Sequence, residues 1–232
     1  MSWQAPAGAA PRQGVEVFHA QLWFTAVRIA PAYLGLVALF ALVAVRITLT
    51  AAREWGLDAI AVELVLRLYA LELMPVLAAL LVALRSGSAI AAELALMRAT
   101  GELAELARAG ARLQRSEYLP RVVATVVAVV ALSLASAGVC FVAIYALAFG
   151  ASPHGAAEFG HAVATVFSPA ALIGFVLKGA LFGIATGAVA VKAGLGADAR
   201  LRSVPVAVRA AMVRLFFLLA AIEIAALALA YV

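Results

Sequence analysis

Charged side chains are scarce in this chain of 232 residues. Lysine, arginine, aspartate and glutamate together make up 12% of the sequence, whereas 67% of the residues are hydrophobic and the mean hydropathy is +1.11. A soluble domain of this size cannot bury so many apolar side chains, because its surface remains large relative to its interior. The composition therefore predicts an integral membrane protein, for which the lipid bilayer is the solvent.

Cysteine and histidine are also rare. Cys140 is the only cysteine and lies in an apolar run, which excludes a disulfide framework and a cysteine-based metal site. His19, His154 and His161 lie in different segments without metal-ligand spacing, so we expect no metal site. No nucleophile–base arrangement or paired-carboxylate site stands out. We therefore expect no catalytic residues, no cofactor and no enzymatic activity.

Two further classes of partner find no support in the sequence. The chain lacks a G-x-x-x-x-G-K-[ST] motif, so we do not expect it to bind ATP as a P-loop protein. The net charge is +5, but the basic residues are scattered between apolar runs. Such charges are typical of the topogenic signals of membrane proteins, and they do not indicate a nucleic-acid partner.

The chain begins with the polar stretch MSWQAPAGAAPRQG, residues 1–14, which we interpret as a flexible lead. It lacks the charged region followed by an apolar region of a cleaved signal peptide. Residues 15–30 combine apolar and aromatic side chains with several polar ones, which predicts a helix lying in the membrane interface. Residues 31–232 are expected to form a single transmembrane domain.

Five apolar stretches follow, at roughly 20 residues for each crossing of the bilayer. They comprise residues 31–50, 60–83, 122–151, 160–191 and 215–232. The second contains Glu72, and also Pro75, which we expect to break its helical ladder. Four crossings remain possible if this stretch is re-entrant. The fourth stretch carries Lys178 and the fifth carries Glu223.

The basic residues predict the orientation. Two connections between apolar stretches are rich in them: Arg98, Arg108, Arg112, Arg115 and Arg121 lie in one, and Lys192, Arg200, Arg202, Arg209 and Arg214 lie in the other. The intervening connection, GASPHGAAEFG, has neither lysine nor arginine. Because lysine and arginine are enriched on the cytoplasmic side, we expect the two basic connections and the N-terminus inside the cell and the C-terminus outside.

The stretch LRSGSAIAAELALMRATGELAEL, residues 84–106, follows the second crossing. Residues 90–107 predict one amphipathic helix, with Arg98, Glu102 and Glu105 on one face and Leu96, Leu103 and Ala107 on another. By itself, this pattern is typical of a solvated loop helix whose charges keep it out of the membrane.

The ionisable residues inside the predicted crossings form a second informative set. Such a group costs from a few to more than about ten kcal/mol at bilayer depth, and it usually faces a partner or a water-filled cavity. Two interpretations stay open. Lys178 forms a packing ion pair with Glu72 or Glu223, or one or more of these residues line a polar strip of a substrate cavity at a subunit interface.

The segment LELMPVLAALLVALRSGSAIAAELALMRATGELAEL resembles the signature region of the MlaE family, the permease subunits of bacterial lipid-transporting ABC systems that work with MCE proteins. The family pattern is E-L-G-P, an apolar run, R-x-G-(S/A)-A, and then A-E-(L/I)-x-x-M-R-x-T-E. The matching residues are Glu72, Leu73, Pro75, Arg85, Gly87, Ser88, Ala89, Ala92, Glu93, Met97, Arg98 and Thr100. Met74 and Gly101 depart from the pattern, replacing a glycine and a glutamate, and they indicate a divergent branch.

The resemblance implies an all-α permease that acts as a homodimer in a bacterial inner membrane and moves phospholipid or a similar lipid. The partners it implies are a cytoplasmic ABC ATPase dimer and a periplasmic MCE-domain protein, and it allows a STAS-type regulator. Residues 90–107 would be the coupling helix that docks on the ATPase. The implied ATPase-coupling residues are Glu93, Met97, Arg98, Thr100, Gly101, Glu102 and Glu105, and the implied lipid-pathway residues are Glu72, Pro75, Lys178 and Glu223. The competing hypothesis is a membrane protein without an ATPase, either an ion-coupled carrier or a structural scaffold.

Overall fold

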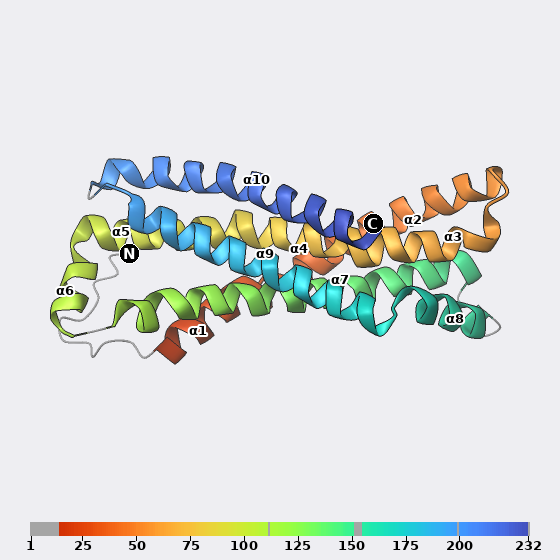
Figure 1. Cartoon of the computed structure of the whole chain (residues 1–232), viewed down its shortest axis with the longest axis horizontal. Helices are drawn as coiled ribbons and strands as arrows, with labels where there is room; N and C mark the ends of the chain where they lie inside the picture. The colour runs from red at the N-terminus through yellow and green to blue at the C-terminus, as the bar shows by residue number, and fades with distance from the viewer. Residues whose placement is uncertain (1–13, 111, 151–154, 199, 232) are drawn as a thin grey trace.

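The computed structural model describes residues 14–110, 112–150, 155–198 and 200–231, and the regular structure in these ranges is helical (Figure 1). Five helical runs are long and apolar enough to cross a membrane: Gly14–Glu54, Ile60–Thr100, Gln114–Phe149, Pro169–Gly196 and Leu201–Leu229. The predicted all-α architecture with about five crossings is thus confirmed. Most of the predicted lead, and His154, lie outside the described residues.

The first run contains α1 (Gly14–Leu22), the π-helical segment η1 (Trp23–Val27) and α2 (Ala30–Glu54). A turn at residues 28–29 separates the first two elements from α2, close to the predicted end of the interfacial helix. The buried residues of α2 recur every three or four positions, from Tyr33 to Ala52, and this face packs against α7 (Leu119–Phe149). The interfacial position of residues 15–30 remains a prediction.

The second run is continuous, and Pro75 does not break it. It comprises α3 (Asp58–Val65), η2 (Leu66–Leu73), α4 (Met74–Val82), η3 (Ala83–Gly87) and α5 (Ser88–Thr100). Proline removes one N–H donor and crowds the preceding turn. The chain accommodates this with the wider π-helical turns of η2, in which the Met74 N–H donates to the Tyr69 carbonyl oxygen. The helix is therefore continuous, while its ladder of α-helical hydrogen bonds is interrupted at Pro75, as predicted.

The predicted fourth crossing is divided in the structure. Helix α8 (Ala156–Val166) ends before Phe167, and α9 (Pro169–Gly196) begins after Ser168. The Ser168 side chain accepts a hydrogen bond from the Ala171 N–H at 3.3 Å, and a proline in the first helical turn needs no partner for its missing N–H. The last run is formed by η6 (Leu201–Ser203) and α10 (Val204–Tyr231), which begins well before the predicted residue 215.

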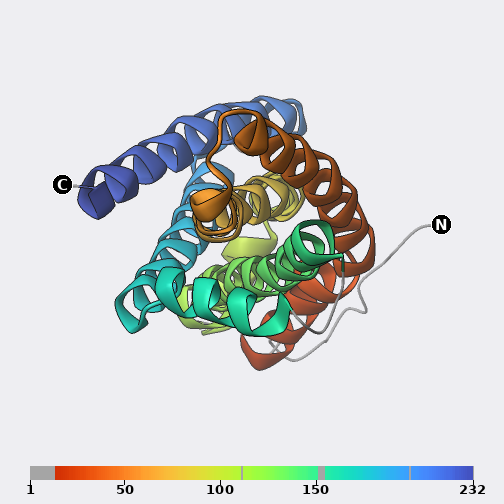
Figure 2. The same ribbon diagram turned by 90° about the vertical axis from the view of Figure 1, so that its right-hand side faces the viewer.

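The helices form an elongated bundle in which α4 and α5 run between α7, α9 and α10 (Figures 1 and 2). Glycines allow α7 and α9 to approach closely: a Cβ atom on Gly187 would lie 2.8 Å from Cα of Val122, and one on Gly183 would clash with the Val126 backbone. The end of α5, the start of α7, the end of α9 and the start of α10 meet at one end of the bundle (Figure 1). This end therefore carries both basic connections.

Candidate functional site

Three ionisable side chains from three helical runs meet inside the bundle, and we call them the Lys178 cluster. Nζ of Lys178, on α9, lies 2.5 Å from Oε2 of Glu72, on η2. The same Nζ lies 3.0 Å from Oε2 of Glu223, on α10. An ammonium group carries three donors, and the Glu72 backbone carbonyl at 3.4 Å is a further acceptor. The lysine thus contacts both of the glutamates that the sequence offered as alternative partners.

The two carboxylates of the Lys178 cluster are not fully enclosed by the chain. The Lys178 side chain is 7% exposed, whereas Glu72 and Glu223 are 19% and 18% exposed. Oε2 of Glu223 is buried but makes no hydrogen bond of good geometry with the described residues. Pro75 is buried one turn beyond Glu72. The cluster therefore has one cation for two carboxylates, and part of it faces outward.

The predicted single coupling helix is interrupted. Helix α5 ends at Thr100, Gly101 adopts a left-handed conformation with φ of 84°, and α6 (Glu102–Arg108) begins in a new direction. Glycine adopts this conformation at little cost because it has no Cβ atom. Leu96 is 48% exposed whereas Leu103 is 8% exposed, so the predicted shared apolar face is not formed. The expectation of one amphipathic helix over residues 90–107 is therefore wrong.

The predicted coupling residues divide into an outward set and an inward set. Arg98 and Thr100 are exposed near the end of α5, and Glu102 and Glu105 are exposed in the first turn of α6. Negative charge at this position suits the positive end of a helix dipole. Met97 is only 8% exposed and belongs to an apolar cluster that anchors the segment to the bundle. Met97 thus contributes packing in the single chain and is not available as a surface contact.

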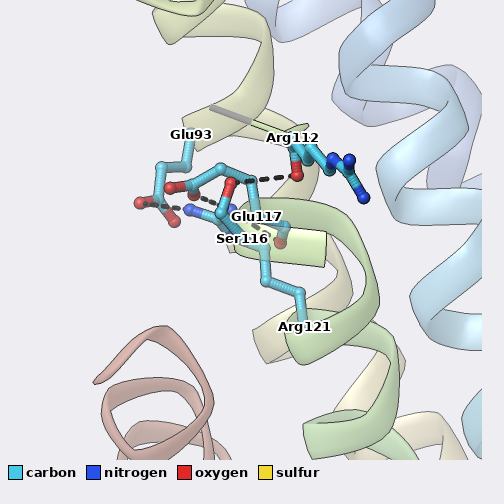
Figure 3. Close-up of polar contacts among 5 residues, drawn as sticks. All are labelled: Glu93, Arg112, Ser116, Glu117 and Arg121. Carbon is cyan, nitrogen blue, oxygen red and sulfur yellow. Dashed lines mark hydrogen bonds and ion pairs between the residues drawn. The ribbon is translucent and has the colours of Figure 1, made fainter. Parts of the chain in front are cut away.

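A buried arginine joins this segment to the next crossing (Figure 3). Nη1 of Arg121, on α7, lies 2.5 Å from Oε2 of Glu117, in η4 (Gln114–Tyr118). Its Nη2 lies 3.0 Å from Oε1 of Glu93, on α5. Arg121 is 2% exposed and Glu117 is 5% exposed. We call these three residues the Arg121 network, and it fixes the start of α7 against the end of the second run.

In the sequence, Arg121 has the position of a loop charge, and Glu117 is not among the predicted site residues. A signal was present, since Glu117 and Arg121 are four residues apart, the spacing at which helical side chains meet. Their burial was not visible from the sequence, because it depends on the packing of α1 against η4 and α7 and on the contact of Arg121 with Glu93 of α5. The structure also brings Glu93 to Arg121, which gives this predicted coupling residue a partner within the chain.

Comparison with known proteins identifies a family for this chain. A search of curated proteins found no match. A family model described as Permease MlaE matches residues 18–229, which is nearly the whole chain and includes both clusters of ionisable residues. The five membrane-crossing runs are what a multi-pass permease requires. The chain therefore belongs to the MlaE permease family and is a membrane permease subunit of a lipid transporter.

Proposed function

We propose that two copies of this chain form the membrane part of an ABC transporter in a bacterial inner membrane. A cytoplasmic ATPase dimer supplies the energy, and a periplasmic MCE-domain protein exchanges phospholipid or a similar lipid with the permease. A small STAS-type regulator is a further candidate component. In this proposal the basic end of the bundle is cytoplasmic, as the enrichment of lysine and arginine on that side predicts.

The observation that carries the proposal is the position of α6. Glu102 and Glu105 are exposed on this short helix at the basic end of the bundle. Exposed charges of one sign can set the register of a helix in the groove of a partner. The bend at Gly101 turns α6 away from the axis of α5, and the Arg121 network joins α5 to α7. Movement of α6 by an ATPase would therefore reach two crossings at once.

We further propose that the Lys178 cluster belongs to the lipid pathway, with Pro75 beside it. The cluster has one carboxylate more than cations, and the exposed parts of the Glu72 and Glu223 side chains can accept hydrogen bonds from a polar headgroup. Within the last run, Leu201–Leu229, only 11% of an apolar stretch of 18 residues is buried inside the chain. The remainder of α10 is thus available to lipid or to a second copy, and a second copy facing the cluster would enclose it at the subunit interface.

Purification of the tagged chain from its native membrane in mild detergent tests this function. Mass spectrometry of the purified material is expected to identify an ABC ATPase, an MCE-domain protein and bound phospholipid. The Lys178 cluster also suits an ion-coupled carrier, since ionisable residues within membranes mark ion pathways. A chain that purifies alone and without lipid, from membranes in which these partners are produced, would contradict the proposal and favour that alternative.

A further inference from the structure

The basic end of the bundle contains a hollow of about 250 Å³ between the end of α9 and the start of α10. Lys192 of α9 and Arg214 of α10 line it, together with Asp198, Ser203 and small apolar residues. This hollow lies outside the Lys178 cluster and outside the Arg121 network. We propose that it binds the anionic, phosphate-bearing headgroup of a phospholipid in the surrounding membrane.

The direction of the side chains explains why two cations meet there. Side chains on a helix lean toward its N-terminus, and α9 and α10 are antiparallel. Lys192, which is exposed four residues before the end of α9, therefore leans along the helix away from the basic end. Arg214, ten residues after the start of α10, leans back toward the basic end. The two side chains converge on one hollow although their positions along the helices differ.

The charge balance favours an anion. In the part of the chain that the structure describes, neither Lys192 nor Arg214 forms an ion pair. The lining of the hollow holds two cations and one carboxylate, Asp198, so its formal charge is +1 (2 − 1). Asp198 is also the only acidic residue from Lys192 to Arg214, a segment with one lysine and four arginines and a formal charge of +4 (5 − 1). The Ser203 hydroxyl lies 2.7 Å from both the Asp198 and the Arg200 carbonyl oxygens and shares its one donor hydrogen between them, which holds the connection beside the hollow in place.

The surroundings favour a lipid as the source of that anion. Apolar side chains on α10 near the hollow are strongly exposed, including Val213 at 53%, Phe216 at 60% and Phe217 at 68%. Acyl chains can pack along this surface while the headgroup occupies the hollow. Basic pockets between transmembrane helices on the cytoplasmic side are suited to anionic headgroups, and each basic residue near such a surface strengthens binding about fivefold.

The test is thermal unfolding of the purified full-length protein in detergent, titrated with phosphatidylglycerol. Phosphatidylcholine with the same acyl chains and inorganic phosphate are titrated separately. We expect phosphatidylglycerol alone to raise Tm. The double variant Lys192→Gln/Arg214→Gln should weaken the apparent affinity for phosphatidylglycerol about 30-fold, from the loss of two basic contacts. Arg209→Gln is the matched control, because Arg209 is exposed on α10 but does not line the hollow.

Three outcomes would overturn the proposal. They are an undiminished response in the double variant, an equal loss in Arg209→Gln, and an equal response to inorganic phosphate. The first two would mean that lipid binds elsewhere or to the basic surface as a whole, and the third would identify free phosphate as the ligand. Glu223→Gln distinguishes this site from the proposed transport pathway. This variant is expected to lose transport but to keep the rise of Tm that phosphatidylglycerol causes.

Discussion

Nη2 of Arg121 on α7 lies 3.0 Å from Oε1 of Glu93 on α5, although the two residues are 28 positions apart in the sequence. Its Nη1 is at the same time bound to the buried carboxylate of Glu117. The two contacts contribute differently to stability, because the Glu93 side chain is 47% exposed and the Glu117 side chain is 7% exposed. Water screens the first contact, whereas Glu117 would remain as an uncompensated buried charge without its arginine.

Arg121→Met is therefore expected to destabilise the protein by about 3–5 kcal/mol, the usual cost of removing one partner of a buried ion pair. Glu93→Gln, which affects only the screened contact, should cost less than about 1 kcal/mol. Thermal unfolding in detergent measures both effects. The double variant Arg121→Met/Glu117→Leu should recover much of the lost stability. An Arg121→Met protein with the same Tm as the unmodified protein would contradict the structural role of the network.

Lys178→Met should reduce yield and thermal stability, because Glu72 and Glu223 would lose their common cation. The matched control is the triple variant Lys178→Met/Glu72→Gln/Glu223→Gln, which removes all three charges and should be recovered in better yield. Lipid content of the triple variant then separates the two roles of the cluster. A stable variant without bound lipid would support the lipid pathway, whereas one with native lipid content would leave only a packing role.

Reversal of charge on α6 tests the coupling proposal. Glu102→Lys/Glu105→Lys is expected to abolish ATP-driven lipid transport while leaving the amount of protein in the membrane unchanged, because both side chains are exposed. Glu158→Lys provides the control, since Glu158 is exposed on α8 at the opposite end of the bundle. Transport and ATP hydrolysis are measured in reconstituted vesicles. Native transport by the double variant would refute the coupling role of these carboxylates.

The bend between α5 and α6 depends on Gly101. Gly101→Ala should destabilise the protein by about 1–2 kcal/mol, because φ of 84° forces a side chain into the left-handed region. A Cβ atom there would meet no neighbouring atom within 4 Å, so the expected cost is purely conformational. Gly138→Ala, in α7 and equally free of neighbours, should be neutral or stabilising. Equal changes in Tm for both variants would argue against a left-handed conformation at Gly101.

The close packing of α7 and α9 depends on Gly187. Gly187→Ala would place Cβ 2.5 Å from Oγ1 of Thr125 and should cost about 1–3 kcal/mol through overpacking. Gly174→Ala on the same helix meets open space and serves as the control. If both variants have the same Tm as the unmodified protein, α7 and α9 can move apart at the contact of Gly187 with Thr125 without loss of stability.

The sequence alone determined the class of the protein and most of its crossings. Bilayer thickness requires about 20 apolar residues for each crossing, so the five runs could be recognised without any tertiary information. The cost of a lone charge in the bilayer likewise predicted that Lys178 would find an acidic partner. The division between α8 and α9 was also accessible in principle, because Ser168 followed by Pro169 is typical of a helix start.

Other features were decided only by the tertiary structure. The sequence suggested a choice between Glu72 and Glu223, but the packing of η2, α9 and α10 brings both to Lys178. Residues 90–107 have a helical pattern, yet the chain bends at Gly101. The bend allows Met97, before it, and Leu103, after it, to pack in the same apolar cluster of α5, α6, α9 and α10. Arg121 has the sequence context of a loop charge but is buried in the first turn of α7, where it pairs with Glu93 of α5 and Glu117 of η4. Periodicity describes each helix separately, whereas burial and ion pairing depend on which helices the bundle brings together.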